Sequence, residues 1–551
     1  MNATTAELAH QQEAGQFAVY NPATQETIGT LPNLTAAQIA DCVSKAAAAQ
    51  LRWAATPVRD RLRILSRFGD LLCDHKEAVA AVISREAGKP EAEALSTEIL
   101  VVLDTVKYLK NNLPGFLRPE PITHGNPAMK LKRGTLLREP YGVVGIISPW
   151  NYPFSVPSVE TLTALATGNA VALKPSEFTP YSSLELQRLL CEAGLDRELL
   201  QVITGEGGAG AALLAANVQK VIFTGSVATG KRVAQAAAAR LLPVVLELGG
   251  KDPMIVLEDA DVDVASSAAV WGAFMNAGQT CLSVERCYVH ESIYQKFLEK
   301  CVEKTAKLRV GSSSHTLRHK QLGDEKSTPA QRVGHPDSEI DVGPMIHARQ
   351  LSIVQSHVQD AVARGARLLA GGTPLPHLGP NFFAPTILAD VDHSMAIMRE
   401  ETFGPTLPVR SFKTEDEAVA LANDSEYGLA ASIFTGDRKR GEALARRIMA
   451  GTVMVNDVLA CFGISEAPHG GVKASGIGRT HGRFGLEEMV WPKYVDSDRL
   501  PRMKKLWWYG YGPAFAQQMG GFVELLFANG LIKRMRGGIK STKSYLHRRI
   551  L

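Results

Sequence analysis

The sequence of 551 residues lacks the features that mark several classes of protein. Its seven cysteines are odd in number, widely spaced and include no Cys-x-x-Cys pair, so neither a disulfide framework nor a metal site is expected. No lysine or arginine occurs before Lys45, so no secretory signal or transit segment is expected at the start. No run of about 18 apolar residues occurs, which argues against a membrane-spanning helix.

The charge is nearly balanced overall but unevenly distributed. The net charge is +4, yet the residues after Leu500 include ten basic side chains and the single acid Glu524. These residues carry a net charge of +9, and the first 500 residues are acidic by five charges. A mildly acidic body therefore carries a basic tail.

The tail is also rich in aromatic side chains between residues 507 and 527. Pro513 and several glycines argue against one continuous helix there. Two interpretations remain open. The tail docks on the body of the protein or on a neighbouring subunit, or it contacts a membrane surface, where rings suit the headgroup zone and cations suit anionic lipid. No nucleic acid is expected as a partner.

The body alternates helix-like and strand-like segments. Four segments with helical periodicity lie between residues 35 and 112, the first with Thr35 as its expected N-cap. Short apolar strands then alternate with helices from residue 142 to residue 248, and a second series of the same style runs from 263 to about 455. This alternation predicts βαβ units and parallel sheets. The polar segment 312–340 interrupts the second series and is expected to be a surface insertion.

Two residues have side chains suited to covalent and acid–base chemistry. Cys281 follows the sequence Gly-Gln-Thr at 278–280, which permits close backbone approach to a ligand; the alternative is an ordinary packing cysteine. As a nucleophile it would need activation, because an unperturbed thiol is largely protonated at neutral pH. Glu247 lies within the apolar run 244–248, where a carboxylate is costly unless it is paired or functional. It is either the partner of Lys251 in a buried salt bridge or a general base for water.

Two loops carry groups that suit anions. In the segment 148–153, two prolines flank Asn151, so its amide can be held in one orientation and donate to an oxyanion; a plain turn is the alternative. The segment 223–230 is strand-like and runs through a glycine-spaced turn into a helix, whose N-terminal N–H groups suit a pyrophosphate. It is not a Walker loop, because Gly230 is followed by Lys231 and Arg232.

The order and spacing of these motifs resemble the aldehyde dehydrogenase superfamily from about Tyr20 to Asp496. The matching stretches are, in chain order, Pro149–Pro153, Gly168–Glu177, Phe223–Ser226, Leu246–Lys251, Gly278–Cys281, Glu400–Pro405 and Pro468–Gly476. The resemblance implies an α/β fold with two Rossmann-like parallel-sheet domains, one cofactor-binding and one catalytic, with a small β oligomerisation hairpin. The tail exceeds the usual length of the family and is expected as a C-terminal extension.

The resemblance also implies a division of the chain. The expected parts are the NAD-binding domain (1–125 and 142–247), the catalytic domain (248–460, with the insertion 312–340), the oligomerisation segments (126–141 and 477–498) and the tail (499–551).

The resemblance implies that Cys281 is the nucleophile, Glu247 the general base and Asn151 an oxyanion donor beside the Cys281 backbone N–H. An aldehyde would be oxidised with NAD to a carboxylic acid through a thiohemiacetal and a thioester. The presence of Glu247 favours hydrolysis of the thioester over transfer to coenzyme A. The alternatives are an NADP-preferring or coenzyme A acylating semialdehyde dehydrogenase and, in another class, a membrane-recruited structural protein that keeps the fold.

The implied cofactor contacts follow the same motifs. Lys174 and Glu177 would meet the adenosine ribose, and Glu401 and Phe403 the nicotinamide ribose and ring. Glu177 favours NAD over NADP, because a carboxylate accepts from a 2′-hydroxyl and repels a 2′-phosphate. The full expected set is Ile147, Trp150, Lys174, Glu177, Gly225, Ser226, Gly230, Leu248, Glu401 and Phe403.

The substrate is expected to be a medium-sized to bulky, apolar or aromatic aldehyde. The side chains in the segment 152–159 are smaller than in many relatives, and Phe274 and Met275 would add apolar lining. No basic residue clearly marks a carboxylated aldehyde. A homodimer or homotetramer is expected, in the cytoplasm or peripheral to a membrane through the tail.

Overall fold

The computed structural model describes residues 15–126, 129–312, 340–505 and 507–546. The chain divides into two compact units, each described by itself below. The first consists of Met1–Arg118 and Arg138–Pro492, and the second of Pro119–Leu137 and Lys493–Leu551. Apart from its two end residues, the expected insertion 312–340 lies outside the described residues.

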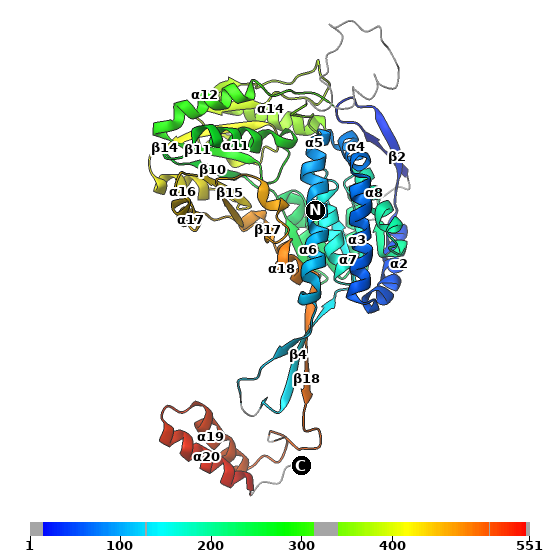
Figure 1. Ribbon diagram of the computed structural model, residues 1–551, viewed down its shortest axis with the longest axis vertical. Helices are drawn as coiled ribbons and strands as arrows, with labels where there is room; N and C mark the ends of the chain where they lie inside the picture. Colours follow the sequence, from blue (N-terminus) through cyan, green and yellow to red (C-terminus); the bar gives the residue numbers. More distant parts are fainter. Residues whose placement is uncertain (1–14, 127–128, 313–339, 506, 547–551) are drawn as a thin grey trace. The chain divides into compact units, whose positions relative to one another are not determined.

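The first unit begins with a two-stranded antiparallel sheet and a series of helices. The predicted N-cap is confirmed: the Thr35 hydroxyl accepts from the Gln38 N–H at 3.4 Å, and the Gln38 amide oxygen accepts from the Thr35 N–H at 2.9 Å. In Figure 1, helices α3 and α6 run side by side. The elements are β1 (Gly15–Tyr20), β2 (Thr27–Asn33), α2 (Ala36–Ala55), α3 (Val58–Asp74), α4 (Lys76–Ala87), α5 (Glu91–Glu93), the π-helical turn η1 (Ala94–Ile99) and α6 (Leu100–Phe116).

A six-stranded sheet forms the centre of the first apolar core. Its strands are short and buried, as expected of parallel strands covered on both faces. All neighbours pair in parallel except β17, which runs antiparallel to β9. The strand order is β17 (Gly476–Ile477), β9 (Val244–Glu247), β8 (Lys220–Thr224), β5 (Val143–Ile147), β6 (Ala170–Lys174) and β7 (Leu200–Val202). The helices between these strands are α7 (Ser155–Ala166), α8 (Pro180–Glu192), α9 (Gly207–Ala215) and α10 (Val227–Ala238).

A seven-stranded sheet forms the second apolar core. Only β12 pairs antiparallel with its neighbour. The strand order is β12 (Arg367–Ala370), β13 (Thr386–Ala389), β14 (Thr406–Phe412), β11 (Val284–His290), β10 (Asp252–Val256), β15 (Ala430–Phe434) and β16 (Thr452–Val455). The associated helices are α11 (Val262–Phe274), α12 (Tyr294–Thr305), α14 (Ala348–Ala363), α15 (Ala396–Arg399), α16 (Glu415–Asn423) and α17 (Arg438–Ala445). Helix α18 (Gly482–Glu488) packs against α6 and α7 of the first core instead. Together the two sheets confirm the predicted α/β fold with two mainly parallel sheets.

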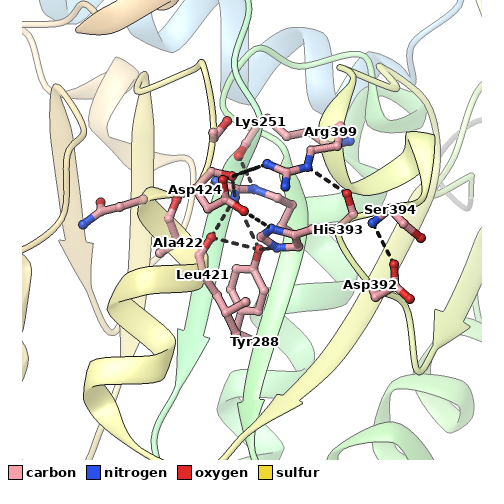
Figure 2. Close-up of polar contacts among 12 residues, drawn as sticks. Lys251, Tyr288, Asp392, His393, Ser394, Arg399, Leu421, Ala422 and Asp424 are labelled. Carbon is pink, nitrogen blue, oxygen red and sulfur yellow. Dashed lines mark hydrogen bonds and ion pairs between the residues drawn. The ribbon is translucent and has the colours of Figure 1, made fainter.

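A buried arginine joins the centre of the second sheet to a helix end. The Arg286 guanidinium on β11 donates to the carbonyls of Leu421 at 3.1 Å and Ala422 at 2.9 Å, at the C-terminus of α16. Figure 2 labels these two acceptor residues. The Arg286 Nε donates to the carbonyl of Lys251, the residue before β10, at 2.8 Å. Because unpaired carbonyls at a buried helix end are costly, these bonds stabilise the packing of α16 against the sheet.

The second unit contains a three-stranded sheet and a helical hairpin. The sheet has the order β18-β4-β3, from Val490–Asp498, Lys132–Pro140 and Glu120–Ile122; β18 and β4 continue into the first unit. The tail forms two antiparallel helices, α19 (Pro513–Phe527) and α20 (Leu531–Leu546), in agreement with the predicted interruption. Across the described ranges, no helix is both long and apolar enough to cross a bilayer.

Candidate active site

A cavity of about 550 Å³ lies in the first unit where the two sheets meet, and Asn151, Glu247 and Cys281 all line it. Asn151 follows β5, Glu247 is the last residue of β9, and Cys281 precedes β11. Ligands of parallel α/β sheets bind at the carboxyl ends of strands, which is where the first two of these residues lie. The structure therefore brings the three predicted catalytic residues to one cavity.

The backbone before Cys281 adopts a rare conformation. The φ angles at 276–278 are +53°, +54° and +70°, and only the last residue is a glycine. A Cβ on Gly278 would lie 2.1 Å from the Gly404 carbonyl oxygen, so a larger residue does not fit there. A left-handed conformation costs about 1–2 kcal/mol at each non-glycine residue and persists only where the surroundings impose it. The turn that presents Cys281 is therefore fixed by its packing.

Hydrogen bonds to both the side chain and the backbone carbonyl hold Asn151 in place. Its side-chain Nδ2 donates to the Gln279 carbonyl at 3.0 Å, next to the turn that carries Cys281. Its own carbonyl accepts from the Lys89 ammonium at 2.8 Å and from the Asn276 side-chain amide at 3.0 Å. Hydrogen bonds thus connect the loop of Asn151 with the turn that carries Cys281.

A fully buried ion pair, which sequence reasoning missed, supports the Asn151 loop. The Lys89 ammonium lies 2.7 Å from the Glu98 carboxylate and 4.0 Å from the centre of the Tyr152 ring. Glu98 also accepts from the backbone N–H groups of Phe154 and Ser155, at 2.9 and 2.8 Å. The sequence signal was a lone lysine between glycine and proline at a helix break, which by itself indicates only a turn.

Glu247 is buried, and neither of its carboxylate oxygens has a hydrogen-bond partner among the described residues. The salt bridge with Lys251 that the sequence left open is not formed, because Lys251 pairs with Glu285. Burial, with the nearby Glu160 carboxylate, raises the pKa of Glu247 well above its ordinary value. A Cβ on Gly470 would lie 2.8 Å from the Glu247 carboxylate, so the glycine leaves room for it.

Glu160 is a second buried carboxyl group on the cavity wall that sequence reasoning missed. Its Oε1 accepts from the Thr224 hydroxyl at 3.2 Å, and its Oε2 has no partner in the described part of the chain. Burial raises the pKa of Glu160 to about 8. The sequence held a signal, because Glu160 is the only ionisable residue of segment 155–166. The structure shows that every residue of this segment, helix α7, is buried, where a carboxylate is costly.

The surroundings of Cys281 disfavour its thiolate. Burial raises the pKa of the Cys281 thiol well above its ordinary value, and the carboxylates of Asp252, Glu401 and Glu247 add to the effect. The thiol therefore requires a change in its surroundings, such as a nearby positive charge, to become nucleophilic.

The predicted cofactor residues divide into two groups. Those on the cavity wall are Trp150, Gly225, Ser226, Leu248, Glu401 and Phe403. Those beyond the lining are Ile147 and Lys174, the last residues of β5 and β6, with Glu177 and Gly230. The Lys174 ammonium lies 3.0 Å from the Glu177 carboxylate, so these two side chains meet each other.

The groups present fit a nicotinamide dinucleotide. Ser226 on the cavity wall is the N-cap of helix α10, and a helix N-terminus suits a pyrophosphate. Glu401 accepts from the Gly250 N–H at 3.1 Å, and burial raises its pKa to about 8. The Phe403 ring meets the Trp150 ring edge-on, with centroids 5.4 Å apart. Carboxylates for ribose hydroxyls, backbone N–H groups and an aromatic face are thus all in place.

A family model places the chain in a known class of enzyme. Residues 9–495 match the model of the aldehyde dehydrogenase family, and the chain belongs to this family. The predicted resemblance, from about Tyr20 to Asp496, is thereby confirmed. Oxidation of aldehydes follows as the activity of the family.

Individual relatives differ in what their names state. A 4,4'-diapolycopene aldehyde oxidase of a Methylomonas species is 39% identical over 532 residues, which cover 96% of this chain and 95% of the relative. A putative succinate-semialdehyde dehydrogenase [NADP(+)] of Mycolicibacterium smegmatis is 37% identical, covering 87% of this chain and 88% of the relative. The crystal structure of an NAD-dependent aldehyde dehydrogenase from Sinorhizobium meliloti has a TM-score of 0.82 and 35% identity, covering 90% of this chain and 93% of that one.

Proposed function

We propose that this enzyme oxidises a medium-sized to bulky apolar or aromatic aldehyde to its carboxylic acid with NAD, and releases the acid by hydrolysis. The observation that carries the proposal is the shared cavity of Cys281, Asn151 and Glu247, in which the buried Glu247 carboxylate accepts no hydrogen bond from the described residues. A carboxylate held in that way is suited to take a proton from water, whereas an enzyme that transfers the acyl group to coenzyme A does not need it.

In the first half of the reaction, the Cys281 sulfur bonds to the aldehyde carbon after its proton has left to solvent. The carbonyl oxygen becomes an oxyanion, to which the Asn151 Nδ2 and the Cys281 backbone N–H donate. A nicotinamide held beside Glu401 and Phe403 would supply the acceptor for the hydride of the former aldehyde carbon. Cys281 then holds the acyl group as a thioester.

In the second half, the Glu247 carboxylate takes a proton from a water molecule, whose oxygen attacks the thioester carbon. The same donors stabilise the second oxyanion, the carbon–sulfur bond breaks, and the carboxylic acid leaves. Because burial raises the pKa of Glu247, the fraction in the required ionised form increases as the pH rises. Hydrolysis of the thioester should therefore become faster with pH.

The cavity wall supports an apolar substrate. It carries Val101, Val156, Val159, Trp271, Met275 and Phe462, and no lysine or arginine is among its described residues. A semialdehyde with a carboxylate would meet Glu160 and Glu247 there without a cationic partner. Of the two residues expected to add apolar lining, Met275 is on the wall, whereas Phe274 is fully buried and lies outside the lining.

The choice of NAD rests on Glu177, whose side chain is 31% exposed and lies beside Lys174. A 2′-phosphate would meet the carboxylate, while the ammonium that could bind it is already paired. The test is kcat/KM with NAD and NADP for the wild type and for Glu177→Gln. We expect a preference for NAD that the substitution reduces; a wild type that prefers NADP would contradict the assignment.

An aldehyde panel with product analysis tests the reaction. We expect apolar aldehydes to have higher kcat/KM than carboxylated ones, and the acid rather than an acyl-coenzyme A to form when coenzyme A is present. In Glu247→Gln, we expect a burst of NADH equal to the enzyme concentration followed by little turnover. Linear NADH formation at the wild-type rate would contradict the role of Glu247.

We further propose the predicted division into an NAD-binding domain, a catalytic domain and oligomerisation segments, with assembly into a homodimer or homotetramer. Strands β4 and β18 of the three-stranded sheet lie in the predicted segments 126–141 and 477–498. Native mass measurement of the full chain tests the assembly, and a monomer would contradict it.

A further inference from the structure

The helical hairpin of the tail packs through small residues. The helices α19 and α20 lie side by side, and the residues buried between them are Gln518, Gly521, Gly537, Ser541 and Ser544. A Cβ on Gly521 would lie 2.5 Å from the Gly537 carbonyl oxygen, and a Cβ on Gly537 would lie 2.6 Å from that of Gly521. The two backbones are therefore in direct contact, which only glycine permits at this crossing.

Large apolar side chains around the turn of the hairpin and along α20 are exposed. The exposed fractions are 72% for Phe527, 74% for Leu531 and 83% for Ile532, around the turn between the helices, and 60% for Met535 and 61% for Ile539. A hairpin that folded in water by burying its own apolar residues would place these between its helices. In this hairpin the fully buried residues are small or polar, and the large apolar side chains around the turn and along α20 are exposed.

The exposed side chains of α20 are sorted by type around the helix axis. At roughly 100° per residue, Leu531, Met535, Ile539 and Ile532 fall within an arc of about 100°. The next sector, of about 80°, contains Lys543, Arg536, Lys540 and Lys533. The buried Gly537, Ser541 and Ser544 occupy the sector after that. One apolar sector and one cationic sector are therefore presented next to each other.

We propose that this hairpin binds the surface of a bilayer that contains anionic lipid, with the apolar sector of α20 and Phe527 inserted at the level of the headgroups. We choose this partner because of charge complementarity. The cationic sector borders the apolar one, so it can contact anionic headgroups while the apolar sector is inserted. Insertion stops at the interface, because α20 is about 24 Å long at 1.5 Å per residue and carries five basic residues.

The tail lies beyond the family model, but part of it is shared with one relative. The family model ends at residue 495. The Methylomonas relative covers 96% of this chain, which leaves about 22 residues unmatched, fewer than the 53 of the tail. That match therefore includes part of the tail, whereas the succinate-semialdehyde relative covers only 87%.

The test is co-sedimentation of the full chain with vesicles of phosphatidylcholine alone or mixed equally with phosphatidylglycerol. We expect binding to the mixed vesicles that weakens as salt is raised, since headgroup attraction is screened. The double substitution Ile532→Asp with Met535→Asp should reduce binding at least tenfold, and Lys533→Gln with Arg536→Gln should remove the preference for the anionic mixture. Leu241→Asp, at a site in the first unit that is 91% exposed, is the matched control and should bind like the wild type.

Three results would overturn the proposal. These are no binding to either vesicle, equal binding by the Ile532→Asp and Met535→Asp variant, or a lower native mass of that variant, which would assign the apolar sector to a contact between protein chains. The inactive Cys281→Ala protein should bind vesicles like the wild type. The vesicle result is thus separate from the proposed reaction, which is judged by NADH formation alone.

Discussion

The catalytic cavity and the tail hairpin solve opposite packing problems. Around the cavity, two apolar cores enclose the strands, and two buried carboxyl groups, Glu160 and Glu247, line the space where chemistry occurs. In the hairpin, glycine and serine are buried while Phe527 and Ile532 are exposed. The difference indicates that the first region is built to take a ligand into a cavity, whereas the second presents apolar and cationic side chains on its outer surface.

The largest expected effect is loss of chemistry without loss of fold. Cys281→Ala removes the sulfur that bonds to the substrate, so NADH formation should fall by at least about 10³-fold. The thermal unfolding midpoint should stay within a few degrees of the wild type, because the substitution removes only the thiol group. Cys461→Ala, a buried cysteine on the same second core, is the control and should keep most activity. Equal losses in the two variants would contradict the role of Cys281.

The buried pair under the Asn151 loop should matter for both stability and rate. Lys89→Met leaves the Glu98 charge buried without its partner, which should lower the free energy of unfolding by about 3–5 kcal/mol. It should also lower kcat, because Asn151 loses a bond that positions it. Denaturant unfolding and steady-state kinetics measure the two effects.

The double variant Lys89→Met with Glu98→Gln sharpens this test. It removes the orphaned charge and keeps an oxygen for the Phe154 and Ser155 N–H groups, so it should recover part of the stability. Lys45→Met, which breaks an exposed pair with Asp41, should leave unfolding unchanged. A Lys89→Met protein as stable as this control would contradict the proposed support of the loop.

The two carboxyl groups of the cavity predict a shift in pH dependence. The Glu160 charge raises the pKa of Glu247, so Glu160→Gln should lower it and move the rising limb of kcat against pH to lower pH. Turnover on that limb should then increase about two- to fivefold at a fixed pH. Glu206→Gln, on the surface, should leave the profile in place. A uniform fall of kcat at every pH in Glu160→Gln would instead show that Glu160 is itself required.

Much of the body could be predicted from its sequence, because local signals and tertiary packing agree there. Thr35 begins a helix as its capping box indicates, and the strand–helix alternation after residue 142 gives the parallel sheet. Cys281, Glu247 and Asn151 could be selected because each lies in a motif that matches a family. Lys89, Glu98 and Glu160 could not, since their importance depends on which distant groups they face after folding.

The hairpin gives the smallest expected effect on catalysis and the clearest contrast with the cavity. Gly537→Val places a branched side chain where a Cβ would already lie 2.5 Å from the Glu524 Cβ and 2.6 Å from the Gly521 carbonyl, so the two helices must separate. NADH formation from a water-soluble aldehyde should stay within about twofold, because the described residues of the cavity wall all belong to the first unit and Gly537 to the second. Vesicle binding should fall severalfold, because the apolar sector of α20 is presented correctly only when α20 packs against α19.

The control is Gly530→Ala, in the turn between the helices. A Cβ there would have no atom within 4 Å, although the φ of +99° disfavours alanine, so its effect on vesicle binding should be milder. Loss of NADH formation in Gly537→Val, with the unfolding midpoint of the body unchanged, would show that the two regions are coupled rather than separate.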